Sequence, residues 1–373
     1  MTRGFSWRSV FIPFAVHTAI VFLSAYVAMH IPELAPAGFV NPLREQTVPF
    51  VEKFIKWDAH WYTYTAQHGY DKQNIVFFPV LIVLLRALLE LGLNISLFGF
   101  IICNLFAFSS FIFLYLVVRQ HYSAEVAQRT LMVFAVMPTS FFLNTIYTES
   151  IFMTFSLASL YYLRQNSWWR AGLFAALATV TRNLGIVIVL VMIYKYITEY
   201  GQWRNRANPL AAMLLSPAAL LGFMAFNYWQ VGDVFAFFTG QQAWGRQFEY
   251  PWVNIWNNAL LIQSRFPVIE PGIVIDMILV LFCIAVLLIL PMRFDFLIPF
   301  PYLILGWIWF FIPLFSTSPW FPLYSMSRFI LVVFPFYILL AQLPRPLFWL
   351  YWIASAVGLF FSTLWFTGWY WIG

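Results

Sequence analysis

The run SLFGFIICNLFAFSSFIFLYLVV, residues 96–118, contains no charged side chain. A helix needs about 20 mostly apolar residues to cross the hydrocarbon core of a bilayer, so this run predicts a transmembrane helix. The whole chain shares its character: 62% of the 373 residues are hydrophobic and 9% are charged. An ordinary soluble domain has roughly 25% charged residues. The composition therefore predicts a polytopic membrane protein, with far more apolar surface than one water-facing globule could bury.

The same length criterion applied along the chain predicts an all-α polytopic membrane protein with about eleven spans. We expect one integral membrane domain over residues 1–373. The first span follows Arg3 and Arg8 and lacks a small-residue cleavage site, which predicts a retained anchor. The predicted spans are residues 10–28, 96–118, 127–145, 149–164, 168–181, 185–200, 209–229, 273–291, 296–315, 326–342 and 347–368.

Basic residues predict the orientation of these spans, because short cytoplasmic turns carry an excess of Lys and Arg. With a cytoplasmic N-terminus, the two long loops, 29–95 and 230–272, lie outside, as does the C-terminus. This frame requires the apolar run 75–92, which contains Pro79, Arg86 and Glu90, to be re-entrant or interfacial. The basic residues of the predicted inner turns are Arg119, Arg129, Arg164, Arg170, Lys195, Arg204, Arg206, Arg293 and Arg345. They also account for the net charge of +6 without a nucleic-acid partner.

The first outer loop contains EQTVPFVEKFIKWDAHWYTYTAQHGYD, residues 45–71. Apolar residues at helical spacing, Val48, Val51, Phe54 and Ile55, predict a helix lying in the headgroup layer. Asp58 begins a second helical piece. It suits two roles, an N-cap or a catalytic carboxylate, and capping does not exclude catalysis.

No metal site is expected in this loop. His60 and His68 lack a third ligand at a metal-site spacing, so we interpret both as interfacial aromatic residues. No Asp-x-Asp pair is present. We therefore expect neither a metal nor another cofactor. Four polar residues inside predicted spans, His17, Asn104, Asn227 and Asp276, are interpreted as satisfied interhelical contacts.

Further polar residues fall at the outer ends of three spans: Tyr147, Thr148 and Glu149; Arg182 and Asn183; and Arg328. Each could be a snorkelling or salt-bridged anchor, but three such sites on one face favour a shared polar cavity. One carboxylate, several guanidinium groups and aromatic walls suit sugar transfer from a lipid phosphate. They equally suit a transporter or flippase of lipid-linked sugars, or a proton-coupled carrier. The absence of a visible internal repeat disfavours a carrier.

Six segments resemble one known family in its own order. The sequence is similar to the type C glycosyltransferases, and among them to the GPI mannosyltransferase II (PIG-V-like) family and its bacterial relatives. The resemblance covers residues 57–341, and two segments depart from the family's usual pattern, FFPV and TRNLG. The matching segments are WDAHWYTYTAQHGYD, VFFPVLIVLLR, MPTSFFLNTIYTESIFMTFSLASLYYL, WWRAGLFAALATVTRNLGIVI, FFTGQQAWGRQFEYPW and SMSRFILVVFPFYILLA.

The resemblance implies an inverting transfer of mannose from a polyprenyl-phosphate donor to an extracytoplasmic glycolipid or glycan. By that resemblance Asp58 is the general base, and Arg182 and Arg328 hold the donor phosphate. A bacterial member would work as a monomer in the plasma membrane, with its site on the outer face. The other candidates for substrate binding are Trp57, His60, Tyr62, Glu149, Asn183, Gln241, Trp244 and Arg246.

Overall fold

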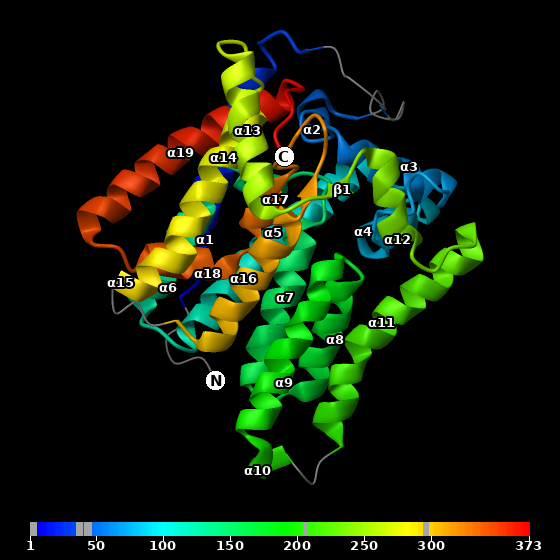
Figure 1. Cartoon of the computed structure of the whole chain (residues 1–373), viewed down its shortest axis with the longest axis vertical. Helices are drawn as coiled ribbons and strands as arrows, with labels where there is room; N and C mark the ends of the chain where they lie inside the picture. The colour runs from blue at the N-terminus through cyan, green and yellow to red at the C-terminus, as the bar shows by residue number, and fades with distance from the viewer. Residues whose placement is uncertain (1–5, 35–39, 41–46, 204–206, 294–297) are drawn as a thin grey trace.

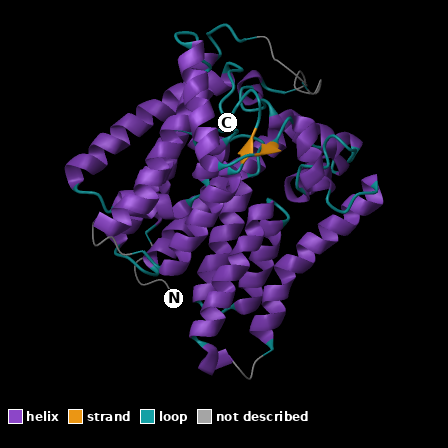
Figure 2. Cartoon of the chain, in the orientation of Figure 1, coloured by secondary structure: helices purple, strands orange, loops and turns teal. Residues whose placement is uncertain are grey.

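The protein is described from a computed structural model of the chain. Residues 6–34, 40, 47–203, 207–293 and 298–373 are described, so Arg3, Arg204 and Arg206 of the predicted topology lie outside this part. Helices dominate it, with one small pair of strands (Figure 2). The elements in chain order are α1 (Trp7–Ala28), α2 (Pro49–Glu52), α3 (Asp58–His68), α4 (Pro79–Glu90), α5 (Ile95–Arg119), α6 (Ala124–Ala135), η2 (Ser140–Leu143), α7 (Glu149–Arg164), α8 (Trp168–Thr179), η3 (Asn183–Val187), α9 (Ile188–Thr198), α10 (Tyr200–Trp203), α11 (Asn208–Val231), α12 (Ala236–Thr239), η4 (Gly240–Trp244), β1 (Gln247–Phe248), α13 (Pro251–Arg265), α14 (Pro271–Ile284), η5 (Ala285–Ile289), α15 (Leu290–Arg293), α16 (Phe300–Leu314), β2 (Ser316–Thr317), α17 (Met326–Leu331), α18 (Phe334–Ala341) and α19 (Arg345–Thr367).

In the described part of the chain, five helical segments are long and apolar enough to cross a membrane: α1, α5, α11, the continuous segment Pro271–Met292 and α19. They coincide with five of the predicted spans. Two shorter apolar segments, Asn183–Thr198 and Phe300–Leu314, coincide with two more. The chain is therefore an all-α integral membrane protein.

Two predicted spans are interrupted rather than continuous. The span 127–145 is helical to Ala135, turns near Pro138 and resumes as η2. The span 326–342 breaks between α17 and α18, whose first turn contains Pro335. Proline cannot donate a backbone hydrogen bond and clashes with the preceding turn. Irregular backbone of this kind is tolerated at membrane depth where protein covers it, and η2 and α18 are buried.

The stretch before Asp58 differs from its prediction. It contains only the four-residue helix α2, and Phe54 and Ile55 are buried. The Phe54 ring lies 5.0 Å from Phe100 of α5 and 5.6 Å from Phe22 of α1. The predicted helix over all four apolar residues is therefore not formed, because Phe54 and Ile55 lie beyond α2 and are buried in the protein. The run 75–92 forms α4, which at 12 residues is too short to span.

Three of the four interhelical polar residues have partners, as predicted. His17 contacts Ala135 O (2.8 Å) and Asn144 Oδ1 (2.7 Å). Asn104 donates to Asn144 O and accepts from the Asn144 side-chain amide, and Asp276 accepts from Ser327 N–H. Asn227 differs, since its buried amide has no hydrogen-bond partner among the described residues.

The short elements gather at one end of the molecule. Figure 1 shows α2, α3, α12 and β1 there with the C-terminus, and α10 at the opposite end. The ends of α1 and α19 meet at this end, where Leu34 N–H donates to Gly368 O (3.2 Å). Strand β1 pairs antiparallel with β2, with Gln247 opposite Thr317. Sequence segments hundreds of residues apart therefore converge on one end of the helix bundle.

Residues from turns that are predicted to be cytoplasmic also lie close together, away from the cavity-forming end. His121, Arg164 and Lys195 lie around a smaller cavity of about 270 Å³ between the ends of α5, α7 and α9. None of these residues lines the cavity described next.

Candidate active site

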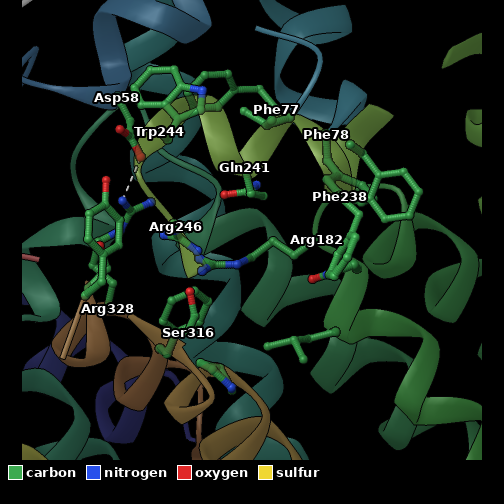
Figure 3. A pocket seen from close by; sticks show the side chains of 18 of the residues that line it. Asp58, Phe77, Phe78, Arg182, Phe238, Gln241, Trp244, Arg246, Ser316 and Arg328 are labelled. Atoms are coloured by element: carbon green, nitrogen blue, oxygen red, sulfur yellow. Dashed lines mark hydrogen bonds and ion pairs between the residues drawn. The ribbon is translucent and has the colours of Figure 1, made fainter. Parts of the chain in front are cut away.

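A cavity of about 940 Å³ opens among the short elements. Its walls come from the first turns of α3, the segment just before α4, the α8–η3 link, the α12–η4–β1 segment, the end of α16 with β2, and the start of α17. Figure 3 shows Asp58 and Arg328 on one side, Arg246 near the middle, and Phe78 with Phe238 on the far side. The cavity therefore has a charged part and an apolar part.

Asp58 is the first residue of α3, and the backbone just before it is strained. Trp57 has φ 51° and ψ −117°, a region that residues other than glycine rarely adopt. Its ring is held edge-on between Trp369 and Trp371, with ring centroids 5.6 and 5.1 Å away. The Asp58 N–H also donates to Tyr147 Oη (3.2 Å). Contacts from distant segments thus fix where α3 begins.

The Asp58 carboxylate faces the cavity and not its own helix. The cap position is Trp57, and no side-chain hydrogen bond caps α3. Asp58 Oδ2 accepts instead from Arg328 Nη1 at 2.7 Å, and 22% of the Asp58 side chain is exposed. The structure therefore uses this residue as a partly exposed, ion-paired carboxylate, and the N-cap interpretation does not apply.

Glu149 lies behind the cavity and joins two arginines. Its Oε1 accepts from Arg182 Nη1 (2.6 Å) and from Arg328 Nε (3.0 Å), and its side chain is fully buried. We call Asp58, Glu149, Arg182 and Arg328 the Arg328 cluster. A buried charge pair is expensive to break by removing one partner. Glu149 therefore holds two guanidinium groups at the cavity wall without lining the cavity itself.

Arg246 is the third guanidinium group of the cavity. It stacks over the Tyr324 ring (4.4 Å) and hydrogen bonds to the Tyr324 hydroxyl. Among the described residues no carboxylate forms an ion pair with it. Burial lowers the pKa of Arg246, since its charge is desolvated. Such a cation suits an incoming anion.

The charges at the cavity do not balance. Three arginines, Arg182, Arg246 and Arg328, face two carboxylates, Asp58 and Glu149, which leaves one excess positive charge among the described residues. Nearby tyrosines stay protonated, because burial raises the pKa of Tyr62 and of Tyr324. The cavity therefore favours a monoanion together with groups that accept hydrogen bonds.

The apolar part is lined by aromatic and aliphatic residues from the segment just before α4 and from η3, α12 and α16. Its members are Val76, Phe77, Phe78, Leu184, Phe237, Phe238, Ile312 and Pro313. No charged side chain belongs to this set, which suits a hydrocarbon chain.

Eight of the eleven candidate residues line the cavity, although they come from four separate segments. Trp244 lies against Trp61 (5.0 Å between ring centroids) and donates through Nε1 to Gln73 O. The eight are Asp58, Tyr62, Arg182, Asn183, Gln241, Trp244, Arg246 and Arg328.

Three candidates lie outside the lining. Glu149 is buried behind the two arginines, and Trp57 packs against the C-terminal tryptophans. His60 is buried and stacks on Trp369, with rings 5.5 Å apart and nearly parallel. These residues support the wall and do not reach the cavity.

Tyr324 and Trp371 are among the lining residues that sequence reasoning did not single out. Both belong to aromatic runs near helix ends, PWFPLY and WYWIG, which look like ordinary interfacial belts. Gly272 of α14 allows the tail to pack closely, because a Cβ there would lie 2.3 Å from Trp371 O. The only sequence feature that could have pointed to these two residues is their place among aromatic residues near helix ends.

No metal-type cluster is found in the described part of the chain, where no three His, Cys, Asp or Glu side chains lie together. The Arg328 guanidinium lies between the Asp58 and Glu149 carboxylates and contacts both. His68 is exposed and contacts Tyr64 O at 3.1 Å.

Known proteins are similar to part of this sequence. A family model described as mannosyltransferase (PIG-V) matches residues 5–266. Human GPI alpha-1,6-mannosyltransferase 2 is 26% identical over 218 residues. The proteins of that name from Rattus norvegicus and Cricetulus griseus are 24% and 27% identical over 218 and 224 residues.

These alignments cover 53% of this chain and 44% of each relative, so the chain spans less than half the length of the curated relatives it matches. The family match ends before Tyr324, Arg328 and Trp371, which complete the cavity from the last part of the chain. The match nevertheless covers well over half of the chain and includes Asp58, Glu149, Arg182 and Arg246. The chain belongs to the PIG-V mannosyltransferase family.

Proposed function

We propose that this membrane protein is an inverting mannosyltransferase that takes mannose from a polyprenyl-phosphate donor. The acceptor is a hydroxyl group of an extracytoplasmic glycolipid or glycan. One observation carries the proposal: a partly exposed carboxylate, Asp58, shares a cavity with three guanidinium groups and an apolar part. Family membership supports the transfer of mannose.

Asp58 acts as the general base in this proposal. The acceptor oxygen attacks C1 of the sugar while the bond from C1 to the phosphate oxygen breaks. The electron pair of that bond leaves with the phosphate, and the acceptor proton passes to Asp58. Attack opposite the leaving group inverts C1, so a single carboxylate suffices.

The guanidinium groups hold the phosphate. Arg246, which has no described carboxylate partner, binds the donor's single negative charge in the ground state. Arg182 and Arg328 stabilise the additional charge that develops as the phosphate leaves. Glu149 is a positioning residue, because it aligns both of these side chains.

The apolar part takes the start of the prenyl chain. Phe78 and Phe238 lie across the cavity from Asp58 (Figure 3), so a lipid entering from that side would present its phosphate to the arginines. The sugar would then reach Gln241 and Trp244. A hydrocarbon lining with a few convergent polar groups is the usual composition of such sites.

Eleven membrane crossings with a cytoplasmic N-terminus place this cavity on the extracytoplasmic face, in the plasma membrane of a bacterial host. Two observations support this orientation. The segments around the cavity lie at one end of the molecule, and His121, Arg164 and Lys195, from turns predicted to be cytoplasmic, lie together around a second cavity. Labelling of a cysteine placed at the exposed Gln202 tests it. Reaction with an impermeant reagent from outside would overturn the orientation.

The activity is tested by mass spectrometry of lipid-linked sugars and glycolipids in cells with and without the gene. Transfer predicts that the donor accumulates and that one glycolipid loses a hexose when the gene is absent. Complementation with Asp58→Asn should not restore the hexose. The alternative, a flippase for lipid-linked sugars, predicts donor trapped in the inner leaflet, and restoration by Asp58→Asn would argue against the proposed base.

A further inference from the structure

Arg328 serves two carboxylates that differ in their surroundings. Its Nε donates to Glu149, which is fully buried, whereas its Nη1 donates to Asp58, which is partly exposed. The guanidinium also lies over the Tyr147 ring (4.5 Å) and near Phe142 (5.4 Å). One edge of the group is therefore anchored in the protein, while the terminal nitrogens lie at the cavity wall.

The proposed reaction changes the charge on both sides of this guanidinium. Before transfer, Asp58 carries one negative charge and the donor phosphodiester carries one. After transfer, Asp58 holds the acceptor proton and is neutral, and the leaving group is a phosphate monoester with two negative charges. The total charge is conserved, but one negative charge has moved from Asp58 to the phosphate.

We propose that Arg328 changes partner during transfer, from the Asp58 carboxylate to the leaving phosphate, a role that rests on the proposed function. While Asp58 is charged, Arg328 is paired with it and contributes little to the donor's monoanion, which Arg246 holds. When Asp58 takes the proton, the pair is dissolved and Arg328 donates to the new phosphate charge. Proton transfer and stabilisation of the leaving group are thereby coupled through one side chain.

The geometry suits such an exchange, because only one contact changes. The bond from Nε to Glu149 can persist, and Glu149 remains fixed by Arg182 at 2.6 Å. Gly373 packs against the aliphatic part of Arg328, so its stem is also held. A preorganised cation of this kind stabilises the transition state more than the ground state, which is what accelerates the reaction.

Binding of two defined probes tests the exchange without turnover. Farnesyl phosphate, a monoester, is a dianion at pH 8, whereas its methyl diester is a monoanion. We would measure the affinity of both probes for the protein in lipid nanodiscs. The variants are wild type, Asp58→Asn, Arg328→Gln and the double variant, and Glu90→Gln removes one exposed surface charge as the control.

The exchange predicts that Asp58→Asn binds the monoester at least about tenfold tighter and gains less for the diester. It also predicts that Arg328→Gln weakens monoester binding about tenfold more in the Asp58→Asn background than in the wild-type background. If the charges of residues 58 and 328 acted on the phosphate independently, their contributions to the binding free energy would be additive. Arg328→Gln would then weaken monoester binding equally in both backgrounds, and that result would overturn the exchange. Wild type that binds neither probe would overturn the proposed donor class as well.

Arg328→Gln leaves Asp58 without its partner and could prevent folding. If it does, the structure of Asp58→Asn with farnesyl phosphate, solved by electron microscopy, tests the exchange of partners instead. The exchange predicts an Arg328 terminal nitrogen about 3 Å from a phosphate oxygen. An Arg328 side chain that remains on residue 58, with the phosphate held only by other groups, overturns it.

Discussion

The two residues next to Trp57 in the chain, Lys56 and Asp58, belong to two different clusters of ion-paired side chains. Of these two residues, Asp58 lines the cavity and Lys56 does not. The Arg328 cluster has been described above. The other group, the Lys56 cluster, consists of Glu33, Glu52, Lys53 and Lys56, four residues that do not line the cavity. Lys56 Nζ lies 2.9 Å from Glu52 Oε1 and 3.5 Å from Glu33 Oε2, and Lys53 pairs with Glu33.

The two clusters differ in their balance of charge and not in how deeply their charged side chains are buried. The Lys56 side chain is fully buried, more so than that of Asp58, and burial lowers its pKa. Yet among the described residues two cations pair with two anions in the Lys56 cluster, so their charges balance. The cavity beside the Arg328 cluster has one excess positive charge. A perturbed pKa therefore occurs in both clusters, and the candidate site is distinguished by an excess positive charge at a cavity, counted over the described residues.

Substitution of Asp58 should have the largest effect on activity and so gives the strongest test of the difference between the two clusters. Asp58→Asn should lower mannose transfer by about 10² to 10⁴-fold, the usual contribution of a general base. Folding should be spared, because the amide keeps the size of the side chain. Transfer in reconstituted membranes and thermal unfolding would be measured together. Asp71→Asn, at an exposed turn, is the control, and near-normal transfer by Asp58→Asn would move the base elsewhere.

Arg246 tests the excess charge directly. Arg246→Gln should raise the KM for the donor about tenfold to a hundredfold, because a charge-assisted hydrogen bond contributes roughly 1.5–3 kcal/mol. The effect on kcat should be smaller than that of Asp58→Asn. Arg265→Gln, an exposed arginine in the same loop, is the matched control. An unchanged KM would assign the ground-state phosphate to the other two arginines.

Lys56 should separate stability from activity. Lys56→Met removes a buried cation that contacts both Glu33 and Glu52, so the protein should lose roughly 1–3 kcal/mol of stability. This is less than the roughly 3–5 kcal/mol of a fully buried pair, because the glutamates are 18% and 28% exposed. Transfer per folded molecule should change less than about threefold. A large loss of transfer without loss of stability would show that the Lys56 cluster is part of the active site.

The smallest expected effect is the pH dependence of the Lys56 cluster. Burial raises the pKa of Glu33, but the hydrogen bond from Lys53 and the charge of Lys56 outweigh it, and the pKa is lowered from 4.5. A carboxyl group with a lowered folded pKa stabilises the protein above its unfolded pKa and loses that effect as the pH falls. The stability difference between wild type and Glu33→Gln, less than about 1 kcal/mol, should therefore shrink between pH 6 and pH 4. A constant difference would mean that Glu33 does not contribute through its charge.

Local patterns predicted the long helices well. The runs that became α1, α5, α11, the segment 271–292 and α19 are visible from hydropathy alone. The interruptions near Pro138 and Pro335 were harder to predict, because the surrounding residues remain apolar where the helix stops. The stretch around Phe54 was misjudged for a related reason, since helical spacing of apolar residues does not distinguish a lipid surface from a protein one.

The sequence by itself determined that the protein lies in a membrane and that Asp58, Arg182 and Arg328 are unusual within it. Both follow from composition over short windows, because each residue's preference for lipid or water acts locally. Only the tertiary structure decided which charges meet. Arg328 reaches Glu149 across 179 residues and Asp58 across 270, whereas Lys56 finds Glu52 one helical turn away. Ion pairs form wherever helix ends bring opposite charges within a few ångströms, and that meeting depends on the packing of all the helices between them.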